Sequence, residues 1–304
     1  MLLLNKSTGM TSNDALQQAK RLFSAAKAGH TGSLDPLATG VLPICFGETS
    51  KFSQYLLTAD KRYASRIQFG VTTETGDADG EVIATADTSQ LTRAQVEAAL
   101  PRFIGDIQQI PPKYSSLKYK GKPLYKWARE GVDVPRQARD ITVFDYRLLN
   151  FYPGPQAQAD VEVHCSKGTY IRTLAEDLGN ALGVGAHVVR LHRSSAGPFD
   201  DVASISLDEL SLERGDQLAN VLDHHLLPVD APAQLLPPIK IVEAAGFYFR
   251  QGQSIMHTEV YRFGSEGDMV RVLSDNGDFL GIGEITGDGK VAPRRLLNTT
   301  QSGN

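Results

Sequence analysis

Residues 29–43 read GHTGSLDPLATGVLP and hold one acid, Asp35, between Leu34 and Pro36. A proline disfavours the helical conformation of the residue before it, so Asp35 is expected to be extended. The three glycines of the stretch allow another segment of backbone to come close. An acid held on a rigid loop between apolar neighbours can serve as a nucleophile or as a general acid or base. A bare Leu-Asp-Pro tripeptide is also typical of an ordinary turn, and the stretch as a whole is predicted to be a loop or turn.

Helical and strand patterns flank this stretch. Thr11, with Asp14 three residues later, predicts the start of a helix. A second helix is predicted after Gly168 and ends at Gly183. The remaining periodicity predicts strands at 61–71, 141–151 and 159–165, a loop at 72–80, helices at 92–104 and 207–226, and an excursion from the core at 107–139.

A proline-rich segment, residues 227–240, predicts a domain boundary. Beyond it, Asn276-Gly277 stands between the apolar runs 270–273 and 279–285, which is a strong hairpin signal. About 65 residues with short strand-like runs suggest a small β-barrel-like domain.

The composition is that of an ordinary globular protein. The chain has 304 residues with a formal net charge of −4, enough for about two domains. Its apolar runs are too short for a transmembrane helix, and the start lacks the features of a signal peptide. Cys45 and Cys165 lie far apart without a CxxC pattern. The chain is therefore expected in a reducing cytoplasm, without a disulfide scaffold or a structural zinc site.

Charge is distributed unevenly along the chain. Residues 113–139 hold eight Lys and Arg against two acids, and three tyrosines and Trp127 lie among the bases. Cations bind phosphates and aromatic faces stack on bases, so this mixture suits a polyanionic partner such as RNA. A solvated basic helix and loop would give the same pattern, and the segment alone does not decide between the two.

Several familiar ligand sites are excluded by their spacing. The Gly-X-Gly pairs at 183–185 and 281–283 lack the third glycine of a dinucleotide loop, and Gly121-Lys122 and Gly289-Lys290 do not continue as phosphate loops. Residues 77–80 lack the remaining ligands of a calcium loop. His164, His187 and His192 show no metal-ligand spacing, so neither a metal nor another cofactor is expected.

The whole run 29–43 resembles the catalytic motif of the TruB family of bacterial tRNA pseudouridine synthases. Residues 60–63 and 73–80 resemble the second motif of that family, and residues 111–118 and 125–131 its RNA-gripping insertion. Residues 167–173 resemble the third motif, and 185–187 with Leu191 the segment after it. The β-rich C-terminal part is similar to the family's small PUA-type RNA-binding domain. The resemblance covers nearly the whole chain.

The chain departs from the family pattern at a few positions. Residues 5–7 are Asn-Lys-Ser where the family more often has an acid, Lys and Pro. His192 stands where Arg is commoner, and Ser33 where Ala is commoner. These departures leave the candidate nucleophile in place and affect the electrostatics around it.

The resemblance implies an α+β fold in which helices flank a mixed, mostly antiparallel sheet and a small PUA-like β-barrel domain follows. It places a catalytic domain at 1–232, with the insertion at about 108–139, and an RNA-binding domain at 238–304. The implied activity is an isomerisation that converts uridine 55 in the T-loop of tRNA to pseudouridine without a cofactor. The expected partner is the T-arm of tRNA, and the expected form is a cytoplasmic monomer.

Roles for individual residues follow from the resemblance. Asp35 would be the nucleophile, and Arg172 would pair with it and keep it ionised. Tyr63 would stack on the flipped base and take part in proton transfer. Lys6 and Asp77 are expected to be structural, with indirect support of the site as the alternative. The expected catalytic and substrate-binding set is Asp35, Arg172, Tyr63, His30, Tyr170, Leu191 and, from the basic insertion, Lys118, Lys120 and Lys122.

Two other classes remain open at this stage. A non-catalytic RNA-binding or chaperone protein would share the insertion and the C-terminal domain, but it would not need a buried carboxylate beside polyanionic RNA. A base-exchanging RNA transglycosylase also uses an aspartate and can carry a PUA-type domain. The expected zinc-type cysteine cluster is absent from this sequence.

Overall fold

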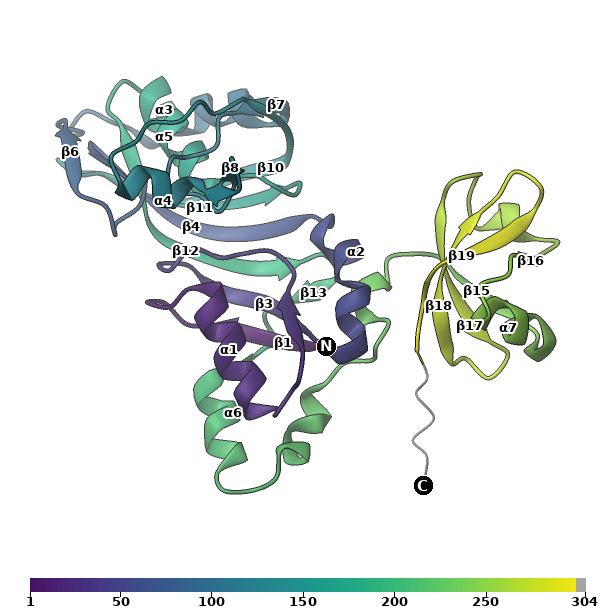
Figure 1. Ribbon diagram of the computed structural model, residues 1–304. Coiled ribbons are helices and arrows are strands. Elements are labelled where there is room, and N and C mark those ends of the chain that lie inside the picture. Colours follow the sequence, from purple (N-terminus) through teal and green to yellow (C-terminus); the bar gives the residue numbers. More distant parts are fainter. Residues whose placement is uncertain (299–304) are drawn as a thin grey trace.

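A computed structural model describes residues 1–298. Its larger part is built on one mixed sheet of ten strands, in the order β14-β1-β3-β12-β4-β11-β10-β7, with β2 paired to β3 and β13 to β12 (Figure 1). Nearly all neighbouring pairs are antiparallel; β1–β14 and β3–β12 are parallel. The strands are β1 (Leu2–Lys6), β2 (Ala28–His30), β3 (Thr39–Phe46), β4 (Lys61–Phe69), β7 (Gly105–Gln109), β10 (Arg139–Tyr152), β11 (Gln158–Cys165), β12 (Ala186–Ala196), β13 (Phe199–Asp200) and β14 (Ile205–Ser206).

Helices pack on this sheet in two groups. At one end α1 and α6 pack on each other and on β1 or β3, while at the other α3 contacts β10 and α5 contacts β12 (Figure 1). The helical elements of this part are α1 (Ser12–Leu22), α2 (Ser53–Leu57), α3 (Arg93–Ala99), α5 (Ile171–Ala181), α6 (Leu207–Arg214) and the 3₁₀ turns η1 (Gly47–Lys51), η2 (Leu100–Phe103), η3 (Ala219–His225) and η4 (Ala231–Ala233).

Local sequence explains the main elements. The side chain of Thr11 accepts a hydrogen bond from the backbone N–H of Asp14, whose carboxylate accepts one from the Thr11 N–H, so α1 begins with a reciprocal cap. In β11 every second residue is buried, which is the alternation of a strand with one face on a core. The predicted strands and the helices after Thr11 and Gly168 are confirmed.

Three sequence-based boundaries were wrong. Residues 29–43 were predicted to be a loop, but β2 and β3 occupy both ends and only residues 31–38 turn, because the apolar residues 41–45 are fully buried inside the sheet. The helix predicted at 92–104 becomes a 3₁₀ turn before Pro101, which has no N–H to donate. The helical region at 207–226 breaks at Gly215, whose φ of +42° lies outside the helical range.

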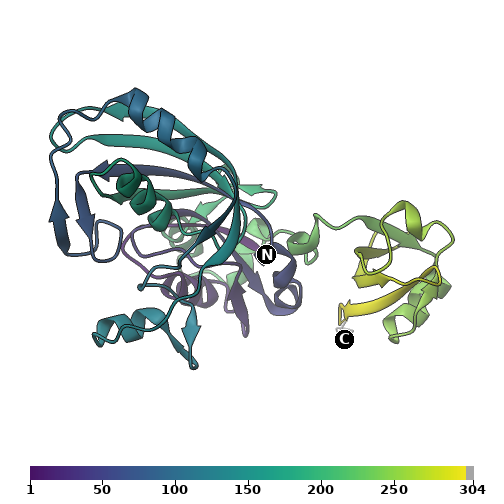
Figure 2. The same cartoon turned by 90° about the horizontal axis from the view of Figure 1, so that it is seen from above.

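The insertion leaves the sheet after β7 and returns at β10. It contains the short hairpin β8 (Lys118–Tyr119) and β9 (Lys122–Pro123) and the helix α4 (Leu124–Arg129). Figure 2 shows it projecting away from the sheet. A second hairpin, β5 (Val71–Thr73) and β6 (Val82–Thr85), lies after β4, so the loop predicted at 72–80 begins in a strand.

The C-terminal part is a curled five-stranded sheet in the order β15-β17-β18-β19-β16, with its own apolar core. Its elements are β15 (Pro238–Ile241), α7 (Glu243–Arg250), β16 (Ile255–Met256), η5 (Val260–Arg262), β17 (Met269–Ser274), β18 (Phe279–Ile285) and β19 (Lys290–Leu296). The hairpin predicted around Asn276-Gly277 is confirmed as β17–β18. The α+β fold class is likewise confirmed. The last six residues of the predicted domain, 299–304, lie outside the described residues.

The two parts meet at a small contact beside α2. The rings of Phe52 and Phe279 meet edge to face with centroids 5.0 Å apart, and Arg271 Nη1 lies 2.8 Å from Asp230 Oδ2. Among residues 1–298, none of the helices combines the length and the apolar character needed to cross a membrane.

Candidate active site

The loop that carries Asp35 is held from both sides. The hydroxyl of Ser12, the first residue of α1, accepts a hydrogen bond from the Leu34 N–H at 2.7 Å and donates one to the Leu34 carbonyl at 3.0 Å. On the other side, the fully buried Lys6 donates to the Pro36 carbonyl at 3.3 Å. Asp35 is therefore fixed between two anchored neighbours, which limits the reorganisation needed at its carboxylate.

Arg172, the second residue of α5, contacts this carboxylate although it lies 137 residues later in the sequence. Its Nε lies 2.8 Å from Asp35 Oδ2, and its Nη2 donates to Asp35 Oδ1 at 3.2 Å. The same guanidinium donates to the carbonyls of Thr75 at 2.7 Å and Tyr114 at 2.8 Å. Only 4% of the Arg172 side chain is exposed, so its fork is locked in place by oxygens from three separate segments.

A second carboxylate shares this guanidinium. Asp77 Oδ2 lies 3.6 Å from Arg172 Nε, and Asp77 is also held by a hydrogen bond from the Thr75 hydroxyl at 2.5 Å. A structural role for Asp77, with indirect support of the site, was predicted from the sequence. In the structure Asp77 lies in the same charge cluster as Arg172 and Asp35.

The electrostatic balance at Asp35 differs from the expectation. Burial raises the pKa of the Asp35 carboxyl above its ordinary value, and this effect exceeds the lowering by Arg172. Asp77 raises the pKa of Asp35 further, whereas Lys6 lowers it. Arg172 favours the ionised carboxylate, as predicted, but burial outweighs it.

This raised pKa predicts a measurable acid limb. If ionised Asp35 is required, kcat/KM should fall on acidification with an apparent pKa above the ordinary carboxyl value of about 3.9. Replacing Asp77 with Asn removes the neighbouring negative charge and should shift that limb to lower pH. Single-turnover rates across a pH series would measure both. An acid limb that is unchanged in Asp77→Asn would contradict the shared charge cluster.

Tyr63 lies buried on β4, directly across from Arg193 on β12. Burial raises the pKa of the Tyr63 hydroxyl, so the phenol stays protonated; the charge of Arg193 lowers this pKa and that of Asp35 raises it. Tyr63 and Leu34, the residue before Asp35, belong to the same apolar core.

Arg193 is a site residue that the sequence analysis missed. It is 1% exposed, donates to the Val41 carbonyl at 2.7 Å and the Gly32 carbonyl at 3.3 Å, and so clamps both flanks of the Asp35 loop. Among residues 1–298, no carboxylate lies within 4.0 Å of its nitrogens. Gly40 makes room for its backbone, because a Cβ there would stand 2.3 Å from the Arg193 carbonyl oxygen. The signal available in sequence was a charged residue at a buried position of a strand.

The predicted substrate-binding residues His30, Tyr170 and Leu191 lie on three different elements of the fold. His30 ends β2, and burial followed by the charge of Arg193 lowers the pKa of its imidazole. Tyr170 caps α5, and the side chain of Gln109 fixes it by accepting from its N–H at 2.8 Å and donating to its carbonyl at 3.0 Å. Leu191 is buried on β12 and lines an open groove of about 590 Å³.

The departure at His192 forms a local network. Its Nδ1 lies 2.8 Å from the Thr39 hydroxyl and its Nε2 lies 2.7 Å from Asp201 Oδ2. The imidazole therefore joins β3 to the turn after β13.

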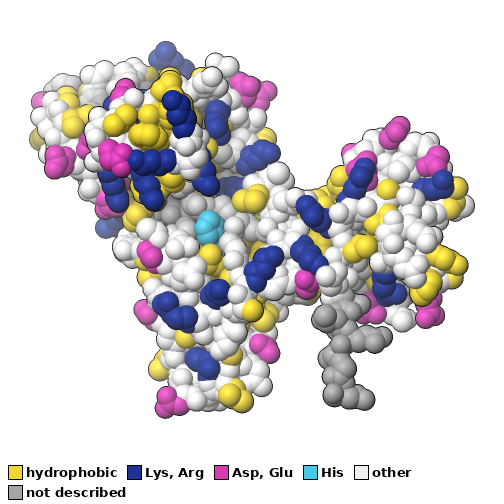
Figure 3. All heavy atoms as spheres, in the orientation of Figure 1, with side chains coloured by type: hydrophobic (Ala, Val, Ile, Leu, Met, Phe, Trp, Pro, Cys, Tyr) yellow, Lys and Arg dark blue, Asp and Glu magenta, His cyan; other side chains and the backbone are white. Residues whose placement is uncertain are grey.

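The three predicted lysines lie in the insertion, apart from Asp35. Lys118 is exposed, Lys120 Nζ lies 5.5 Å from the centroid of the Tyr119 ring, and Lys122 Nζ lies 4.2 Å from that of Trp127. Lys122 also pairs with Glu130. Figure 3 shows Lys and Arg side chains gathering over this part of the molecule. Because the Tyr114 carbonyl accepts from Arg172, the base of the insertion is connected directly to the Asp35 cluster.

Family models match most of the chain. Residues 20–171 match the model of the TruB family pseudouridylate synthase N-terminal domain. Residues 172–234 match the tRNA pseudouridylate synthase B C-terminal domain, and 237–297 match the model described as pseudouridine synthase II TruB, C-terminal.

Curated relatives are similar over nearly their full length. The tRNA pseudouridine synthase B of Saccharophagus degradans is 54% identical over 298 residues, covering 98% of this chain and 95% of the relative. That of Ectopseudomonas mendocina is 52% identical over 299 residues, with the same coverage.

Solved structures share the fold at low identity. The structure of an H/ACA RNP bound to a substrate RNA containing 2'-deoxyuridine has a TM-score of 0.73 at 21% identity, covering 99% of this chain and 85% of that one. The archaeal box H/ACA sRNP Nop10-Cbf5 complex has a TM-score of 0.71 at 23% identity, covering 97% and 85%. With a family model matching half of the chain and relatives more than 50% identical throughout, the chain belongs to the TruB family of pseudouridylate synthases.

Proposed function

We propose that this protein converts uridine 55 in the T-loop of tRNA to pseudouridine, with Asp35 as the nucleophile. The observation that carries the proposal is the ion pair between Asp35 and the buried Arg172, on an anchored loop, in a chain 54% identical to a tRNA pseudouridine synthase B. The reaction breaks the bond between C1′ of the ribose and the uracil, turns the base and joins it through C5. No atom or electron is gained or lost overall, so the isomerisation requires no redox cofactor.

The neighbouring residues would bind the flipped base. A uridine inside a folded loop has to be extruded before an enzyme can reach it. Tyr63 is proposed to stack on the extruded base and to take part in proton transfer, with Tyr170 and Leu191 as walls of the pocket. His30, whose depressed pKa favours a neutral ring, is proposed to stack into the vacated position or to hold the opened loop.

The rest of the chain would hold the tRNA. We propose that residues 1–232 form the catalytic domain and residues 238–304 a PUA-like domain that also contacts the T-arm. The protein is proposed to act as a monomer in the cytoplasm. The basic insertion at about 108–139 is proposed to grip the RNA backbone, since its cations lie outside the Asp35 cluster.

Replacing Lys118, Lys120 and Lys122 together with Ala should weaken tRNA binding and flatten its dependence on salt. Each phosphate that is neutralised by a lysine releases counterions. For each lysine removed, the slope of log K against log[salt] should therefore become shallower by up to roughly 0.7–0.9. Lys122 should contribute least because Glu130 already pairs with it. Filter binding across a salt series would measure the slope, and the single-turnover rate at saturating enzyme should change much less. Equal slopes for variant and parent would remove these lysines from the interface.

The test of the function is to incubate the protein with an unmodified tRNA transcript and map pseudouridine. We expect modification at uridine 55 and none in a transcript with cytidine at that position. Binding without any modified nucleotide would favour a non-catalytic RNA-binding protein. Release of free uracil with incorporation of another base would favour a transglycosylase.

A further inference from the structure

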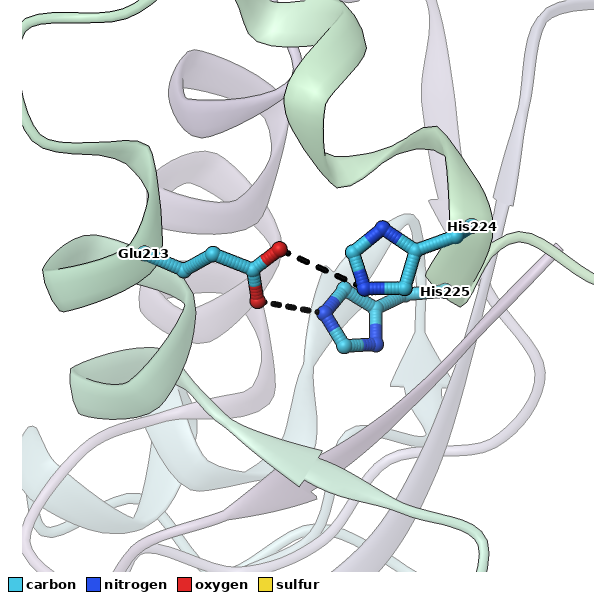
Figure 4. Close-up of side chains that lie close together, drawn as sticks. All are labelled: Glu213, His224 and His225. Carbon is cyan, nitrogen blue, oxygen red and sulfur yellow. Dashed lines mark hydrogen bonds and ion pairs between the residues drawn. The ribbon is translucent and has the colours of Figure 1, made fainter.

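A second cluster of ligand-type side chains lies outside the Asp35 site. Glu213 is in the last turn of α6, and His224 and His225 end η3 (Figure 4). Their carboxylate and imidazole ligand atoms all lie within 4.8 Å of one another. Both rings turn toward the same carboxylate: His225 Nε2 is 2.8 Å from Glu213 Oε2 and His224 Nε2 is 3.3 Å from Oε1.

One ring nitrogen of His224, Nδ1, bonds to the backbone, and the other, Nε2, faces Glu213. His224 Nδ1 lies 2.9 Å from the Val221 carbonyl oxygen, which can only accept, so Nδ1 carries a proton. In the neutral tautomer Nε2 is then an unprotonated acceptor, and it faces the carboxylate of Glu213, which is also an acceptor. In that tautomer Nε2 and the carboxylate can both act as ligands to one metal ion placed between them. A backbone carbonyl on the outer nitrogen is also the usual way in which a metal-binding imidazole is oriented.

The second histidine brings a further ligand nitrogen to the same carboxylate. The rings of His224 and His225 are 3.9 Å apart between centroids, at an angle of 41°. A single divalent ion could therefore be bound by both ring nitrogens and the carboxylate of Glu213. Donors about 2.1 Å from a tetrahedral ion stand about 3.4 Å apart. The His224–Glu213 separation of 3.3 Å is close to this value, and the His225–Glu213 separation of 2.8 Å would lengthen on binding.

We propose that Glu213, His224 and His225 bind a divalent transition-metal ion of the zinc type. Two imidazoles and a carboxylate form a donor set that suits Zn²⁺, Co²⁺, Ni²⁺ or Cu²⁺ rather than Mg²⁺ or Ca²⁺, which prefer oxygen. Because 60% of the His224 side chain is exposed, water can complete the coordination and the ion can exchange. This site is independent of the proposed reaction at Asp35.

The effect of the ion would be on stability. Its ligands join the end of α6 to the end of η3, so it would close the ten-residue connection of residues 214–223. The chain directly after His225 pairs with the start of β1, where the Leu227 N–H donates to the Met1 carbonyl at 2.7 Å. The bound ion would therefore restrain the segment that hydrogen-bonds to the residue before β1.

The experiment uses full-length protein without a histidine tag, freed of metal by a chelator and titrated with Zn²⁺ in a calorimeter and with Co²⁺ in a spectrophotometer. We expect one saturable site, the intense visible bands of tetrahedral Co²⁺, and a higher melting temperature with Zn²⁺, because an ion that binds the folded state stabilises it. Glu213→Gln and His225→Gln should each weaken binding by at least about tenfold through loss of one ligand. His164→Gln removes a histidine whose Nε2 lies 3.9 Å from Asp60 Oδ2 and serves as the matched control, expected to bind as the parent does.

The parent protein alone can overturn the proposal. If it shows neither saturable Zn²⁺ binding nor tetrahedral Co²⁺ bands, the cluster holds only protons. If Glu213→Gln, shown to be folded by circular dichroism, binds both ions as tightly as the parent, the metal lies elsewhere. Should that variant fail to fold, the Co²⁺ spectrum of the parent still decides the question.

Discussion

Asp35→Asn should lower the single-turnover rate of pseudouridine formation by more than about a thousandfold, while affinity for tRNA changes little. The substitution preserves the shape of the side chain and removes the anionic oxygen that would attack. Because Ser12 and Lys6 hold the neighbours of Asp35 through backbone groups, the loop should keep its position in the variant. Asp200→Asn, at the exposed second residue of β13, is the matched control. A rate within about tenfold of the parent would remove Asp35 as the nucleophile.

The same variant should be more stable than the parent near neutral pH. A carboxyl with a raised pKa binds more protons in the folded than in the unfolded state, so stability falls as pH rises from the ordinary value through the folded-state pKa. Above that window the parent keeps a half-buried charge that the folded state disfavours, and Asn does not. Melting temperatures of parent and variant should therefore diverge as the pH rises through the window. A gap that stays constant with pH would contradict the raised pKa.

The elements of the fold were largely predictable because their signals are local. A cap at Thr11, alternation along β11 and a turn at Gly277 depend on residues close together in sequence. The ends of the loop at 29–43 were not predictable, because β3 exists through pairing with β1 and β12, and β12 lies about 150 residues away. There the burial of an apolar run outweighed the local preference of Gly and Pro for turns.

The site divides in the same way. Asp35 and Arg172 were identified because complete motifs surround them, and their contact spans 137 residues of sequence. Arg193 and the Glu213 cluster were missed because only their neighbours in the folded structure mark them as candidate sites. A buried arginine at one position of β12 reads as an ordinary strand residue until the carbonyls of Gly32 and Val41 are placed around it.

Arg172→Lys should retain less than about a tenth of the parent's single-turnover rate, and Arg172→Met should lose still more. The guanidinium contacts both oxygens of Asp35, donates to two backbone carbonyls and lies 3.6 Å from Asp77. An ammonium has one nitrogen and cannot reach this set at once. In Arg172→Met both carboxylates lose their cation. For the buried Asp77, removing one partner of a buried pair typically costs about 3–5 kcal/mol of stability.

Two readouts separate positioning from simple loss of folding. If Arg172 positions Asp35 and favours its ionised form, the lysine variant should stay folded and partly preserve the acid limb. The methionine variant should shift that limb to higher pH, because the cation that lowers the pKa of Asp35 is gone. Arg136→Lys is the control, since within residues 1–298 the hydrogen bond that Arg136 donates goes to the Pro111 carbonyl at the base of the insertion. A lysine variant that turns over as fast as the parent would show that the fork geometry is not used. An unshifted acid limb in a folded Arg172→Met would show that Arg172 does not set the charge of Asp35.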